Sequence, residues 1–197
     1  MSESIFAPPE ADVETRPANE QAYYVVSPIK FYLLATLTLN IYFVYWFYRN
    51  WRLIKQREDN DTWPPMRSLF YIFFTHSLLT DVDETLKARG ITYDWAPMGI
   101  ATLFVVLTVT VNILDRVVGE SIGDPIKDLV GTALILVAPA ILLRGQRAMN
   151  VACDDPAGET NARFTLANWA WMVPGGLIWL LAIFGLYAMF FAPEWLA

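Results

Sequence analysis

Cysteine and histidine are nearly absent from this chain of 197 residues, and their scarcity excludes several kinds of site. The single cysteine, Cys153, cannot form an internal disulfide or a multi-cysteine metal cage. The single histidine, His76, leaves no histidine pair to hold a metal or a haem, or to relay protons. We expect no catalytic residue, no cofactor and no metal site; a non-enzymatic protein is favoured, and an enzyme stays an open alternative.

Positive charge is also sparse. The chain has 14 Lys and Arg against 20 Asp and Glu, which gives a net charge of −6. The few cations lie beside apolar runs and form no basic stripe, so nucleic acid is not an expected partner.

The first 28 residues lack an apolar core behind a basic start, which excludes a signal peptide. They are instead acidic and contain four prolines, a composition typical of disorder. The sequence therefore predicts a disordered acidic tail over 1–28.

Hydrophobic residues are abundant, at 55% of the chain, and 15% of the residues are aromatic. The run 31–48, FYLLATLTLNIYFVYWFY, has no charged side chain and is followed at once by cations. As a helix rising about 1.5 Å per residue, it approaches the ~30 Å thickness of a bilayer core. Further spans are predicted at 96–114, 128–144 and 166–192, within a single membrane domain over 29–197.

The stretch 63–79 is apolar but contains His76 and begins at a Pro-Pro pair. Spanning, re-entrant and interfacial placements are all open for it. If it does not cross, ten cations lie on one side, leaving Arg16, Lys30, Arg116 and Lys127 opposite; if it crosses, the division is nearly even. The positive-inside rule favours the first arrangement, with both termini outside. The predicted fold is therefore all-α: a bundle of four transmembrane helices plus one cytoplasmic interfacial amphipathic helix over 63–88.

Polar residues inside apolar runs are the candidate intramembrane contacts. Without a partner, the amide of Asn40 would cost roughly 2 kcal/mol or more, so we expect it to point into the bundle. It would bind a substrate, or form an interhelical hydrogen bond with Thr108, Thr110 or Asn112.

Two helix interruptions have two interpretations. Pro139 and the run Pro174-Gly175-Gly176 could free carbonyl groups for a ligand, or could only kink helices and allow close packing.

The basic run 49–57 interleaves cations with apolar residues, as an interfacial helix on anionic lipid does. Contact with anionic lipid headgroups and docking of a protein partner both remain open for its four cations: Arg49, Arg52, Lys55 and Arg57.

The segment 36–55, TLTLNIYFVYWFYRNWRLIK, carries the pattern Thr-Leu-x-x-Tyr-x-x-Tyr-Trp-Phe-Tyr-Arg. It resembles a family of small bacterial multi-pass membrane proteins of unknown function, which usually has glycine at the position of Asn40. The resemblance implies a protein of the bacterial inner membrane and brings no catalytic residues.

The sequence predicts an accessory or scaffold subunit of a membrane complex, whose partners are lipids and other membrane proteins or further copies of itself. A small transporter or channel that uses the Pro/Gly-interrupted helices is the alternative. A lipid-modifying enzyme is the third possibility.

Overall fold

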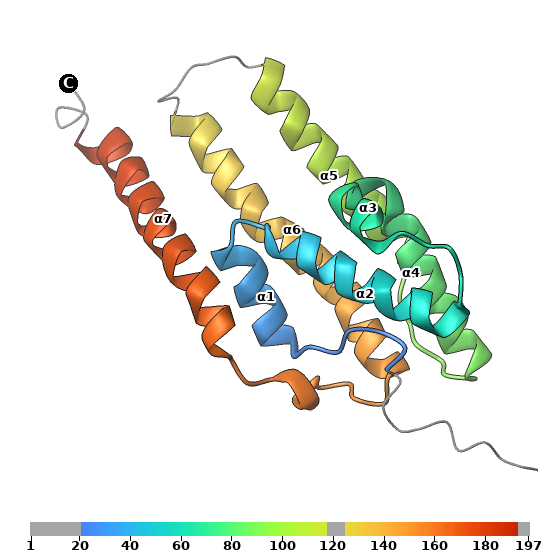
Figure 1. Ribbon diagram of the computed structural model, residues 1–197. Coiled ribbons are helices and arrows are strands. Elements are labelled where there is room, and N and C mark those ends of the chain that lie inside the picture. Colours follow the sequence, from blue (N-terminus) through green and yellow to red (C-terminus); the bar gives the residue numbers. More distant parts are fainter. Residues whose placement is uncertain (1–20, 118–124, 193–197) are drawn as a thin grey trace, which may run out of the picture.

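The computed structural model describes residues 21–117 and 125–192, and over these residues every regular element is a helix (Figure 1). The predicted all-α class is confirmed. The helices of the described residues, in chain order, are α1 (Pro28–Leu37), α2 (Tyr42–Glu58), α3 (Pro64–Leu69), α4 (Tyr71–Ala88), α5 (Pro97–Val117), α6 (Pro125–Ala152), the short 3-10 helix η1 (Glu159–Asn161) and α7 (Leu166–Phe191).

Proline and polar caps begin most of these helices. Proline stands at the first position of α1, α3, α5 and α6, where its missing N–H costs no helical hydrogen bond. Ser27 caps α1, and its side chain accepts a hydrogen bond from the backbone N–H of Lys30. A capping box formed by Thr165 and Asn168 begins α7.

Helix α6 is the centre of the fold and contacts α1, α4, α5 and α7. Figure 1 shows α5, α6 and α7 as three long helices, with α1 between α6 and α7 and the shorter α3 and α4 on the side of α5. The buried core is strongly aromatic where α2 meets this frame, and includes Phe43, Trp46 and Phe47.

The predicted span over 31–48 is wrong as a single helix. Helix α1 ends at Leu37 and α2 begins at Tyr42. Between them, Leu39 and Asn40 have φ angles of 53° and 67°, in the left-handed region that ends a right-handed helix. The two helices form a hairpin, which we call the α1–α2 hairpin.

Because of the hairpin, the middle of α2 lies beside the segment that precedes α1. Tyr24 precedes α1, yet its backbone N–H donates to Asn50 Oδ1 at 3.0 Å. The guanidinium of Arg49 lies 4.9 Å from the centroid of the Tyr24 ring. The prediction that the N-terminal segment and the basic run lie on opposite sides of the bilayer is therefore wrong.

Two further boundaries differ from expectation. The predicted interfacial helix over 63–88 is divided into α3 and α4, which meet at Phe70. The disordered tail predicted for 1–28 extends too far, because Tyr23, Val25 and Val26 are packed against the core. Residues 1–20 of that prediction lie outside the described residues.

Two helices are long and apolar enough to cross a membrane, by length and composition alone: α6 over Asp128–Ala152 and α7 over Leu166–Phe191. The apolar part of α5, Pro97–Ile113, is shorter. These two helices support a location in a membrane.

Helix α7 contacts α1 through a narrow strip that includes Gly175 and Trp179. A Cβ atom added to Gly175 would overlap the carbonyl oxygen of Leu37, so the two helices approach through a bare backbone. One turn later, Trp179 Nε1 donates to the carbonyl oxygen of Thr36 at 2.8 Å. Close packing is therefore the role of Gly175 in the interrupted run.

Gly175→Ala should separate α7 from α1, because the new methyl group cannot coexist with the Leu37 carbonyl. Overpacking of this kind costs about 1–3 kcal/mol, so the thermal unfolding midpoint in detergent should fall by roughly 2–12 °C. Gly176→Ala is the matched control, since a Cβ there meets nothing within 4 Å. Equal midpoints for the two variants would show that the strip does not hold α7.

Candidate functional site

An extended segment, 22–27, is held by side-chain amides at one end of the molecule. Asn150 on α6 binds Val26 twice: its Nδ2 donates to the Val26 carbonyl at 3.0 Å, and its Oδ1 accepts from the Val26 N–H at 3.3 Å. One turn earlier on α6, Gln146 Nε2 donates to the Tyr24 carbonyl at 3.1 Å. Gln146 and Asn150 are fully buried.

Two more amides complete this arrangement. Asn50 on α2 accepts from the Tyr24 N–H, and Asn161 Nδ2 donates to the Val25 carbonyl at 2.9 Å. Lys30 Nζ in turn donates to Asn161 Oδ1 at 2.7 Å. We call the four residues Asn50, Gln146, Asn150 and Asn161 the amide clamp.

The amide clamp is also linked within itself and to the aromatic core. Gln146 Nε2 donates to Asn150 Oδ1 at 2.7 Å, and Trp46 Nε1 donates to Gln146 Oε1. Because each buried amide has partners on both its oxygen and its nitrogen, the clamp orders the segment without leaving polar atoms unpaired. It therefore provides binding and order, and no group in it is a nucleophile or a base.

The clamp residues were missed by the sequence analysis. Gln146 and Asn150 are four residues apart and so share one face of α6, just past its apolar stretch. That spacing is the signal that could have found them.

Beside the amide clamp, Tyr23 joins an ion pair between Arg57 and Asp81. The Tyr23 hydroxyl donates to Asp81 Oδ2 at 2.6 Å, and Arg57 Nη2 lies 2.8 Å from Asp81 Oδ1. Burial, together with the Asp81 carboxylate, raises the pKa of Tyr23 above its ordinary value, so the phenol stays protonated and remains a donor.

The four candidate docking cations are not equivalent. Arg57 is engaged with Asp81, and Arg49 lies over Tyr24 while donating to the Tyr45 hydroxyl at 3.0 Å. Arg52 and Lys55 are exposed and pair with no side chain in the described part of the chain. Of the four, Arg52 and Lys55 are the two whose charged groups make no contact of this kind within the described residues.

The two candidate intramembrane amides lie near each other but do not bond directly. Asn40 Nδ2 donates to the carbonyl oxygen of Ile135 on α6 at 3.3 Å. Asn112 Nδ2 donates instead to the carbonyl oxygen of Thr108, one turn back on its own helix, at 2.8 Å. Asn40 thus makes an interhelical bond, but with the backbone of α6 and with none of the expected side chains.

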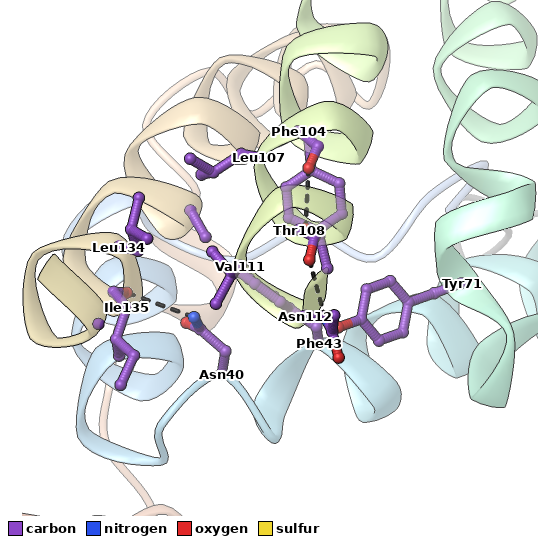
Figure 2. Close-up of a pocket in the computed structure, with 12 residues that line it drawn as sticks. Asn40, Phe43, Tyr71, Phe104, Leu107, Thr108, Val111, Asn112, Leu134 and Ile135 are labelled. Carbon is purple, nitrogen blue, oxygen red and sulfur yellow. Dashed lines mark hydrogen bonds between the residues drawn. The ribbon is translucent and has the colours of Figure 1, made fainter. Parts of the chain in front are cut away.

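Both amides line a crevice of about 90 Å³ between the hairpin turn, α5 and α6 (Figure 2). Its walls are mostly apolar and include Phe43, Phe104 and Leu134, and no charged residue lines it. Asn40 Oδ1 is buried there without a hydrogen-bond partner. An unpaired buried acceptor costs about 1–3 kcal/mol of stability, so a hydrogen-bond donor that reached this oxygen would be stabilised.

His76 and Asp81 do not pair with each other, and no metal-binding cluster lies in the described ranges. His76 Nε2 lies 3.0 Å from the hydroxyl of Thr102, whereas Asp81, five residues on, is bound to Arg57. Over 21–117 and 125–192, no group of three or more His, Cys, Asp or Glu could hold a metal ion.

No protein-family model, curated protein or solved structure matches this chain. The resemblance of 36–55 to a family of small bacterial membrane proteins therefore stays a prediction.

Asn150→Leu should release the extended segment, because it leaves the Val26 N–H and carbonyl and one amide proton of Gln146 without partners. We expect a loss of roughly 2–5 kcal/mol in stability, and faster hydrogen exchange at the Tyr24 and Val26 amides. Gln56→Leu, which changes an exposed amide of α2, is the control. Unchanged exchange at Val26 in Asn150→Leu would contradict the role given to the clamp.

Proposed function

We propose that the protein is a non-enzymatic integral membrane component that serves as an accessory or scaffold subunit of a membrane complex. The main support for this proposal is the apolar surface of α7. Its large apolar side chains are exposed on most sides, including Leu180 at 65% and Leu181 at 71%. Among the described helices α7 contacts α1 and α6, and lipid or a partner would cover its exposed remainder.

A topology for this subunit follows from the hairpin. We place α5, α6 and α7 across the bilayer and the α1–α2 hairpin in its cytoplasmic half. The hairpin turn lies beside Ile135, near the middle of the apolar stretch of α6. A turn at that depth is acceptable because the backbone N–H groups of Leu39, Asn40 and Ile41 all donate to carbonyl oxygens of α1 and of the turn itself.

Charge supports this placement. Segments 21–96 and 144–165 hold eleven lysines and arginines, whereas Arg116 and Lys127 are near the opposite ends of α5 and α6. This division of lysines and arginines is more uneven than the ten against four of the four-span topology. By the positive-inside rule, we therefore put the segment before α1 in the cytoplasm. The C-terminal end of α7 is then outside.

An exposed apolar patch on α3 and the start of α4 fits the same depth. Its members are Trp63, Met66, Leu69, Phe70 and Phe73, the last 78% exposed. Behind it, Arg67 lies 4.2 Å from the centroid of Trp51, so the cation is shielded by a ring. We infer that this patch enters the cytoplasmic leaflet without crossing the bilayer.

Single cysteines in a Cys153→Ser background test the topology. With Gln21→Cys, Gln56→Cys and Arg116→Cys, a membrane-impermeant maleimide should label the first two from the cytoplasmic side and the third from the other side. Labelling of Gln21→Cys and Gln56→Cys from opposite sides would reject the re-entrant hairpin.

The exposed pair Arg52 and Lys55 is the proposed docking point for an acidic partner surface. Arg52→Ala with Lys55→Ala should lower partner retention in mild detergent by roughly three- to tenfold, the loss expected for two exposed ion pairs. Arg144→Ala with Arg147→Ala removes the same charge from exposed positions of α6 and is the control. Equal retention by both double variants would reject this docking point.

A further inference from the structure

The crevice beside Asn40 has the features of a ligand site inside the membrane. Accepting the proposed membrane placement, it lies at the depth of the hairpin turn, where the surrounding medium is hydrocarbon. We propose that it binds the hydroxyl end of a long-chain alcohol dissolved in the bilayer. The hydroxyl donates to Asn40 Oδ1, and the first methylene groups fill the apolar crevice.

The polarity of the crevice selects a hydrogen-bond donor. Asn40 Oδ1 is the buried polar atom of the lining that has no partner, and it can only accept. The nitrogen of the same amide is already bound to the Ile135 carbonyl, which fixes the direction of the oxygen. A ligand must therefore bring one donor and an otherwise apolar body.

Water gains less from this crevice than a linear alcohol does. Apart from Asn40, the polar side chains of the lining are Tyr71, Thr108 and Asn112, and the rest of the lining is apolar. A linear alcohol needs one partner for its hydroxyl and gains contact with Phe104 and Leu134 for its chain.

The size and opening of the crevice suit one end of a linear molecule. Its volume of about 90 Å³ is smaller than the ~150 Å³ of an engineered cavity that holds benzene. Asn112 lines the crevice and is also exposed, so the crevice reaches the surface there. The rest of the chain extends through this opening into the lipid.

Two residues of the lining allow a selective test. Asn40 has φ +67°, a conformation that glycine adopts freely, so Asn40→Gly removes the acceptor and keeps the turn. Gly131 lines the crevice, and a Cβ there meets nothing within 4 Å, so Gly131→Val fills the space. Gly176→Val, at a glycine of α7 with the same open surroundings, is the matched control.

The experiment uses the full chain in lipid nanodiscs and two photoreactive probes: hexadecanol bearing a diazirine, and its methyl ether, which lacks the donor. In the wild type, the alcohol should label α5 and α6 about three- to tenfold more than the ether, the worth of one hydrogen bond. Asn40→Gly should reduce this ratio to about one. Gly131→Val should lower labelling by both probes, and Gly176→Val should change neither.

Equal labelling of the wild type by the two probes overturns the proposal, and is the result for a crevice holding only water or hydrocarbon. An alcohol preference that survives in Asn40→Gly overturns it too. If Gly131→Val does not fold, Asn40→Gly decides the question alone. Carbonate extraction of the wild type tests the membrane placement separately: release rejects that placement, whereas retention with equal labelling rejects the ligand alone.

Discussion

The binding of segment 22–27 by the amide clamp is the constraint on which the remaining structure depends. Asn150 and Gln146 fix this segment against α6, and its last residue, Ser27, caps α1. With its start fixed, α1 has ten residues, or about 15 Å, before the left-handed turn reverses the chain. Helix α2 must then return toward segment 22–27, which Asn50 binds as well. The clamp thus closes the α1–α2 hairpin at its open end.

This closure changes what the first apolar run means. Eighteen uncharged residues cross a bilayer as one helix, but as two half-length helices joined by a turn they reach only about its middle. Hydropathy is the same in both cases, and only the backbone at Leu39 and Asn40 distinguishes them. A hairpin keeps the cations before and after the run at one end, and this accounts for the sharper charge asymmetry of the re-entrant topology.

Much of the fold could be predicted from apolar periodicity and helix-start signals. The helical class and helices α5, α6 and α7 follow from such patterns, whereas for Gly175 the sequence left both close packing and a ligand role open. The turn at 38–41 could not, because its signal is a single Asn40 in an apolar run. The resemblance to a family with glycine there was the relevant hint, since glycine and asparagine are the residues that accept left-handed backbone. The clamp was missed because its four amides come from three distant segments, and their common target is backbone.

The basic run illustrates why a linear pattern cannot assign roles to like charges. On α2, Asn50, Ile54 and Arg57 follow the helical spacing of three and four residues and face the protein, whereas Arg52 and Lys55 lie between them and face outward. Arg57 is half-buried, and its pairing with Asp81 and Tyr23 compensates for its desolvation. Its charge is therefore used to hold α2 against α4. Arg52 and Lys55 make no such ion pair within the described residues. Burial, more than position in the run, therefore decides which cations can bind a partner.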